Sequence, residues 1–177
     1  MIIGFGHRSG VGKDTAAKLL KTDLRRNGES VEIISFASVL KKNCHQMCGW
    51  AGLEDELFYN NNREARLTPL PKLGGKTPVD IWVEVGEAMR AIHEDTWVEA
   101  LFAQAAADHL LIPDVRHQNE VEIIKRYGGM VIRIDRDVPA LPGKSIDDLL
   151  GDYDEWDAVV KNDGDLRNLN DKLLELI

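Results

Sequence analysis

The chain has 177 residues, of which 44% are apolar and 29% charged, and its formal net charge is −8. This composition fits one globular domain with a core, and the negative charge argues against a nucleic-acid coat or a membrane-surface binder, because both partners are polyanions. The two cysteines, Cys44 and Cys48, argue against a disulfide scaffold and favour a cytoplasmic location.

In the first half of the chain, short apolar runs alternate with runs of helical periodicity. The apolar runs predict strands over Ile2–Phe5 and Val31–Phe36. The periodic runs predict helices over Thr15–Asn27 and Ala37–Cys48, each followed by glycine. A more polar stretch from about 54 to 99 predicts helices on either side of a Pro- and Gly-rich segment, 68–78, which we expect to be a substrate loop.

The second half continues the alternation. It predicts a helix, a buried strand, a helix and another strand, over Thr96–Asp108, His109–Pro113, Asn119–Tyr127 and Met130–Ile134. An irregular polar segment, Asp135–Asp154, separates these from a short strand over Ala158–Val160 and a closing helix over Leu166–Ile177. Alternating strands and helices predict an α/β fold with parallel strands joined by crossover helices.

The most informative motif is a glycine-rich turn between the first strand and the first helix, Gly6-His7-Arg8-Ser9-Gly10-Val11-Gly12-Lys13-Asp14-Thr15. Glycines let backbone N–H groups approach phosphate oxygens, the helix N-terminus adds free donors, and Lys13 supplies a cation. In the eight-residue P-loop pattern, His7 stands at the position of the first glycine. Asp14 follows the lysine where a hydroxyl is usual, which leaves metal ligation by Thr15 open.

A carboxylate follows the buried strand that begins at His109. Asp114 stands at its expected end and Arg116 lies two residues further on. Because carboxyl ends of parallel strands line the ligand site, Asp114 is a candidate for holding Mg²⁺ or its waters, and Arg116 for clamping a phosphate. A surface ion pair, such as one between Arg116 and Glu120, is the alternative.

With these residues in place, the chain resembles the bacteriophage-type deoxynucleoside monophosphate kinases, of the adenylate-kinase-like branch of the P-loop kinases. The segments that carry the resemblance span nearly the whole chain; they are Gly12–Thr15, Ser35–Lys41, Thr77-Pro78 with Gly86 and Arg90, Asp95–Val98, Asp114–Arg116 with Asn119-Glu120, and Asn162–Gly164. The resemblance implies a three-layer P-loop fold, with a five-stranded parallel sheet and flanking helices. It also implies ATP and Mg²⁺ as co-substrates.

Carried over by position, the resemblance implies roles for individual residues. The ATP phosphate cradle would be Gly10, Val11, Gly12, Lys13, Asp14 and Thr15. The metal would lie near Asp114 and Thr15. Arg90 and Arg116 would contact the acceptor phosphate or the transition state, and Arg136 would be a further catalytic arginine. The acceptor would bind in an insertion over about 37–93, near Lys41 and Arg90. A short lid over about 135–154 would begin near Arg136.

Two departures from the family pattern affect the acceptor site. Val79 follows Pro78 where an arginine is common, and Glu87 follows Gly86 where a threonine is common. Part of the acceptor clamp would then come from elsewhere, with Arg63 and Arg66 as candidates. Trp82 is the best candidate for stacking on a base, although a packing role is the commoner one for tryptophan.

The expected reaction is transfer of the ATP γ-phosphate to a deoxynucleoside monophosphate. An acceptor monophosphate is mostly ionised at neutral pH and needs no general base. Two alternatives stay open: a P-loop kinase with another acceptor, of the dephospho-coenzyme A, shikimate or gluconate type, and a nucleotide-binding module without transfer. The expected partners are small nucleotides, without nucleic-acid polymer or membrane. Base preference, sugar preference and oligomeric state stay open, a homodimer being one alternative.

Overall fold

The computed structural model describes residues 1–138 and 150–177. Contacts divide the chain into two compact units, which we call the sheet unit, residues 1–35 and 104–177, and the helical unit, residues 36–103. Among the described residues, no helix is both long and apolar enough to cross a membrane.

The sheet unit is built on a five-stranded sheet in the order β2-β3-β1-β4-β5. The strands are β1 (Ile2–Gly6), β2 (Val31–Ile33), β3 (His109–Val115), β4 (Met130–Asp135) and β5 (Ala158–Lys161). Every neighbouring pair is parallel. This confirms the α/β fold and the five-stranded parallel sheet predicted from the sequence.

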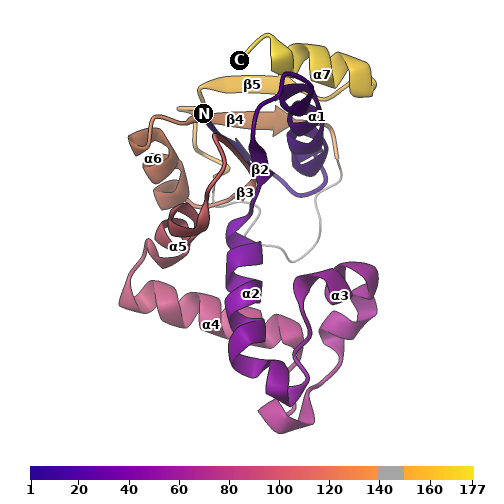
Figure 1. Cartoon of the computed structure of the whole chain (residues 1–177), viewed down its shortest axis with the longest axis vertical. Helices are drawn as coiled ribbons and strands as arrows, with labels where there is room; N and C mark the ends of the chain where they lie inside the picture. Colours follow the sequence, from indigo (N-terminus) through magenta and orange to yellow (C-terminus); the bar gives the residue numbers. More distant parts are fainter. Residues whose placement is uncertain (139–149) are drawn as a thin grey trace. The chain divides into compact units, whose positions relative to one another are not determined.

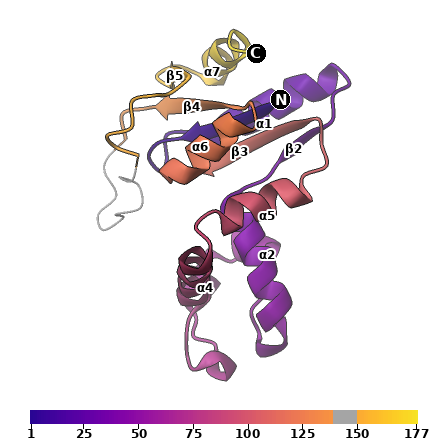
Figure 2. The same ribbon diagram turned by 90° about the vertical axis from the view of Figure 1, so that its left-hand side faces the viewer.

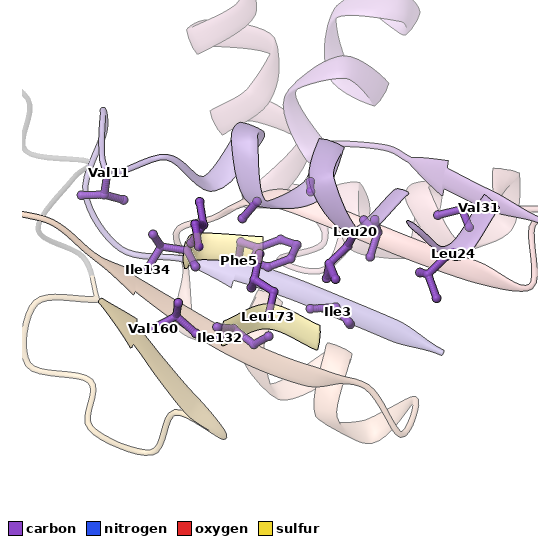
Figure 3. Close-up of a cluster of buried hydrophobic side chains, with 14 residues drawn as sticks. Ile3, Phe5, Val11, Leu20, Leu24, Val31, Ile132, Ile134, Val160 and Leu173 are labelled. Carbon is purple, nitrogen blue, oxygen red and sulfur yellow. The ribbon is translucent and has the colours of Figure 1, made fainter. Parts of the chain in front are cut away.

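Helices cover both faces of this sheet, as Figures 1 and 2 show. On one face lie α1 (Lys13–Arg26) and α7 (Leu166–Leu174), and on the other lies α6 (Gln118–Arg126). Successive residues of β1 face opposite sides of the sheet, and each side is covered by helices. Ile3 and Phe5 are fully buried in the core beneath α1 and α7 (Figure 3). Gly4 faces α6, because a Cβ there would lie 2.8 Å from Ile124 Cδ1.

Local signals in the sequence fix the ends of α1. The helix begins directly after Gly12, and its first turn carries Asp14, which favours the positive end of the helix dipole. Arg25 and Arg26 occupy the last turn, at the negative end of that dipole. Gly28, with φ +85°, ends the helix, since this backbone conformation favours glycine.

The helical unit holds α2 (Phe36–Cys48), α3 (Glu56–Asn61), α4 (Pro78–Ile92), and most of α5 (Thr96–Gln104). Short 3₁₀ turns η1 (Gly49–Ala51), η2 (Arg63–Leu67) and η3 (Pro71–Leu73) connect the first three. Its core contains Cys44, Leu53, Tyr59, Ile81 and Trp82. The thiol of Cys44 therefore has a packing role. Burial raises its pKa, and the nearby Cys48 raises it further, to about 11.

The Thr-Pro pair of the sequence has a structural role at the start of α4. Thr77 is the N-cap, its side chain accepts from the backbone N–H of Asp80, and Asp80 in turn accepts from the backbone N–H of Thr77. Pro78 fits the first helical turn because no donor is needed there. This reciprocal pair fixes where α4 begins, and its hydrogen bonds from Thr77 lower the pKa of Asp80.

Candidate functional site

The glycine-rich turn leaves the sheet at the carboxyl edge of its central strand. Gly6, the last residue of β1, pairs with Val115 of β3 on one side and with Arg133 of β4 on the other. We call residues 6–12 the phosphate loop; it leads directly into α1. Ligands of parallel α/β sheets bind at this edge. The position predicted for a phosphate site is thus the one that the topology favours.

The backbone of the phosphate loop takes left-handed conformations at three positions. Gly10 and Gly12 have φ of +84° and +104°, and His7 has φ of +92°. Glycine adopts these angles without steric cost, whereas a residue with a Cβ does so only under strain. The turn brings the chain from β1 to the N-terminus of α1, where unpaired backbone N–H groups favour an anion.

Lys13 is held close to its own loop. The residue is 7% exposed, and Nζ donates to the backbone carbonyls of His7 at 2.7 Å and Arg8 at 2.5 Å. A buried ammonium is costly unless it is paired with acceptors. The two carbonyls therefore fix the cation beside the residues that would meet the β- and γ-phosphates.

Asp114 and Arg116 flank the residue that pairs with the start of the loop. Gly4 pairs with Ile112 and Gly6 with Val115, so one residue of β1 faces two residues of β3. Pro113 lies in this bulge, where its missing N–H removes no regular ladder bond. Asp114, predicted at the end of the strand, lies one residue before its last residue, Val115, the partner of Gly6.

Glu120 fixes the chain that leaves β3. The residue is 3% exposed, and its carboxylate Oε2 accepts from the backbone N–H groups of Arg116 at 2.7 Å and His117 at 3.0 Å. Glu120 is the third residue of α6. A carboxylate at this position stabilises a helix start by satisfying free donors. It therefore orients the backbone at Arg116.

Asn162 follows β5 and contacts the far end of the phosphate loop. It is 7% exposed, and its side-chain Nδ2 donates to the carbonyl of Val11 at 2.8 Å. Its backbone N–H donates to the carbonyl of Asp135 at 2.7 Å. A Cβ on Gly12 would lie 2.5 Å from Nδ2, so glycine is required there for close approach as well as for its φ. In the sequence, Asn162 is marked only by the family resemblance, through the segment Asn162–Gly164.

The candidate acceptor residues lie in the helical unit. Lys41 Nζ forms an ion pair with Glu56 at 2.8 Å and lies 5.4 Å from the centre of the Trp82 ring. Trp82 is 9% exposed and packs edge-on against Tyr59 at 5.2 Å. The structure thus gives Trp82 a packing role, and base stacking by it stays a prediction.

The arginines of the helical unit have separate surroundings. Arg66 donates to the carbonyl of Tyr59 at 3.2 Å and to Asn60 Oδ1 at 2.9 Å, which holds the end of α3. Arg63 is exposed. Arg90 Nη1 lies 3.3 Å from Glu87, the residue that replaces the threonine common after Gly86 in the resembled family. The structure brings Lys41 and Trp82 together and leaves the roles of the arginines as predictions.

No protein-family model matches the chain. A protein of Acanthamoeba polyphaga mimivirus, described as "Putative deoxynucleotide monophosphate kinase", is 32% identical over 164 residues. The match covers 84% of this chain and 78% of that protein.

The chain belongs to the deoxynucleotide monophosphate kinase family. It is a P-loop kinase of small molecules, as the resemblance drawn from the sequence predicted.

Two solved structures also resemble this kinase, each at 12% identity and each covering 99% of this chain and 95% of the other. One is a shikimate kinase from Aquifex aeolicus, with a TM-score of 0.49. The other is the APS kinase of Mycobacterium tuberculosis in complex with AMPPNP and APS, with a TM-score of 0.45. Neither bears on the substrate of this kinase.

The residues predicted for Mg²⁺ in this kinase have suitable donor atoms. Kinases hold Mg²⁺ through one or two carboxylates, waters and substrate phosphates. The carboxylate of Asp114 and the hydroxyl of Thr15 supply oxygen donors of that kind, and both residues are part-exposed. The donor set therefore fits the ion.

The predicted lid falls mostly outside the described residues. Asp135 is the last residue of β4 and Arg136 is exposed directly after it. Residues 139–149, the centre of the predicted lid over 135–154, are outside the part of the chain that the structure describes. The lid and the role of Arg136 stay predictions.

The His7 side chain, within the phosphate loop of this kinase, is neutral at neutral pH. Its side chain is 8% exposed, and Nδ1 lies 3.3 Å from the carbonyl of Ile134, which can only accept, so the ring nitrogen donates. Burial and the cation of Arg133 lower the pKa of His7, against the opposing effects of the Ile134 carbonyl and Asp135, and Arg8 lowers it further. The contact with Asp135, at 3.8 Å, is therefore not an ion pair at neutral pH.

This lowered pKa predicts a pH dependence of stability. Between the folded-state pKa of His7 and its ordinary value of 6.5, the unfolded chain binds more protons than the folded one. Stability is then lost as the pH falls through 6.5 towards the lower value. We expect the Tm of His7→Asn, which has no titrating ring, to fall less steeply between pH 7.5 and 5.5 than that of the wild type. Parallel Tm curves would contradict the assignment.

Proposed function

We propose that the chain transfers the γ-phosphate of ATP to a deoxynucleoside monophosphate and releases ADP and the diphosphate. The observation that carries the proposal is the register between β1 and β3. Gly6, where the phosphate loop begins, pairs with Val115, between Asp114 and Arg116. A phosphate cradle, a candidate metal ligand and a candidate phosphate clamp thus come from adjacent central strands.

In the proposed reaction, an oxygen of the acceptor phosphate attacks the γ-phosphorus of ATP. The bond from that phosphorus to the bridging oxygen breaks, and the electron pair leaves with ADP. No proton has to move, because the acceptor's second pKa is about 6. Catalysis then rests on alignment and on charge stabilisation by Lys13 and Arg116. Mg²⁺, which Asp114 and Thr15 would hold directly or through water, would supply further positive charge.

The name of the viral relative supports a deoxynucleotide as acceptor. We assign acceptor binding to the helical unit, with Lys41, Arg63, Arg66 and Arg90 as candidate contacts. A phosphate dianion needs cations, and these residues bring four basic side chains to that unit.

A single-turnover assay with γ-labelled ATP tests this function. The acceptors would be all four deoxynucleoside and ribonucleoside monophosphates, together with dephospho-coenzyme A, shikimate and gluconate. We expect the label in a nucleoside diphosphate. Label in one of the other three products would replace the proposal by that activity. ATP binding without transfer to any acceptor would favour a non-catalytic nucleotide-binding module.

The proposed metal role of Asp114 predicts a change in Mg²⁺ dependence. Asp114→Asn keeps the size of the side chain and removes the charge that a hard cation prefers. We expect the Mg²⁺ concentration for half-maximal rate to rise, while Asp108→Asn, an exposed aspartate at the other end of β3, leaves it unchanged. Rates measured at a series of Mg²⁺ concentrations check this. If the two variants have the same dependence, Asp114 has only a structural role.

A further inference from the structure

Two buried side chains connect the phosphate loop to the carboxyl end of β4. At the start of the loop, the ring of His7 donates to the carbonyl of Ile134. At its end, the carbonyl of Val11 accepts from Asn162, whose backbone N–H donates to the next carbonyl, that of Asp135. Two consecutive carbonyls of β4 therefore anchor both ends of the loop.

The backbone of His7 is strained, and the hydrogen bond from its ring to the carbonyl of Ile134 opposes that strain. In the part of the chain that the structure describes, His7 is the only residue other than glycine with positive φ. It occupies the position where the P-loop pattern has its first glycine. A non-glycine residue keeps such a conformation only if its surroundings enforce it. The buried ring and its hydrogen bond to Ile134 restrain His7 in this conformation.

The conformation of His7 also sets the direction of its own carbonyl, which accepts from Lys13. The backbone carbonyls of His7 and Arg8 accept from Lys13 Nζ. If His7 turned to an ordinary φ, its carbonyl would point elsewhere and the ammonium would lose that acceptor. Asn162 acts on the opposite end, where the Val11 carbonyl directly precedes Gly12 and the start of α1.

We propose that His7 and Asn162 are positioning residues that hold the phosphate loop of the nucleotide-free protein in its phosphate-binding conformation. Neither needs to touch the nucleotide. Their effect is preorganisation, because a loop that is already ordered loses less entropy when it binds phosphate. The consequence for ATP affinity rests on the proposed function, whereas the effect on the loop itself does not.

The chain offers matched variants for a test. Asn162→Ala and His7→Ala each remove one connection. His7→Asn keeps the first, because asparagine tolerates positive φ and its Nδ2 occupies the position of the ring Nδ1. Asn170→Ala is the control: Asn170 also donates through Nδ2 to a distant partner, Asp23, at 2.7 Å, but this bond joins α7 to α1.

The first measurement uses no nucleotide. Trypsin cleavage after Arg8, which is exposed within the loop, is compared with cleavage after Arg26, which is exposed at the end of α1. Mass spectrometry of the fragments gives the ratio. We expect the ratio to rise in Asn162→Ala and His7→Ala, and to stay at the wild-type value in His7→Asn and Asn170→Ala. Equal ratios in all variants would overturn the proposal.

The second measurement is the Kd of ATP, by calorimetry without an acceptor. We expect it to rise roughly tenfold in Asn162→Ala and His7→Ala, the effect of about one lost hydrogen bond, and to change little in the other two. A higher cleavage ratio with unchanged Kd would overturn a positioning role. A wild type that does not bind ATP would refute the proposed function, while the cleavage ratio still decides whether the two residues hold the loop.

Discussion

Lys13→Met should reduce phosphate transfer on the order of 10³-fold, the upper end of the loss seen when one donor to a developing charge is removed. Methionine keeps an unbranched apolar side chain but has no ammonium to align the transferring phosphate. The variant also loses the hydrogen bonds from Lys13 Nζ to the carbonyls of His7 and Arg8. Because these bonds lie within one loop, we expect a folded protein with a lower Tm.

Single-turnover transfer and Tm, measured on the same preparations, check this expectation. Lys18→Met is the matched control, since Lys18 is exposed on the same helix, further along the chain. It should transfer phosphate at the wild-type rate. A folded Lys13→Met protein that also keeps the wild-type rate would remove Lys13 from the mechanism.

The phosphate loop and the alternation of strands and helices could be anticipated because their signals are local. A short apolar strand, a glycine-rich turn and a helix that begins near Lys13 require no distant information. The same holds for β4 and β5, whose apolar runs match the strands within one residue. The motif also placed His7 at a glycine position, and the structure adds that His7 has the backbone conformation of glycine there.

Boundaries that depend on distant contacts could not be anticipated. The strand predicted over Val31–Phe36 ends at Ile33, and the buried Phe36 begins α2, since an apolar run fits either element. The helix predicted to Asp108 ends at Gln104. Alanines follow, but the chain has to extend so that the N–H of His109 reaches the carbonyl of Ser30. The pairing of β2 with β3 outweighs local helix propensity there.

The contacts of the candidate site depended most on the fold. Asn162 and Val11 are joined by a hydrogen bond across most of the chain, and no local pattern in the sequence pairs them. Trp156 likewise packs on Gly6, where a Cβ would lie 2.4 Å from its ring. Glu120 was visible as a residue four positions after Arg116, but its burial and its bonds to backbone donors were not.

Arg116→Ala should lower kcat on the order of 10²–10³-fold, with a smaller change in the KM of either substrate. The guanidinium can hold two phosphate oxygens at once, and a contact that strengthens as charge develops is lost mainly from kcat. Arg116→Lys should recover only part of the rate, because an ammonium offers a point charge in place of a planar fork.

The structure also separates this role from a structural one. Glu120 bonds to Arg116 through the backbone N–H, which every substitution except proline retains, so the start of α6 survives in both variants. A side-chain ion pair between the two residues would affect stability without affecting kcat. Steady-state kinetics and Tm are measured for both variants, with Arg126→Ala, an exposed arginine at the end of α6, as control. A normal kcat with a slightly lower Tm in Arg116→Ala would reduce Arg116 to a surface charge, whereas a large loss of kcat at unchanged Tm requires its guanidinium at the transferring phosphate.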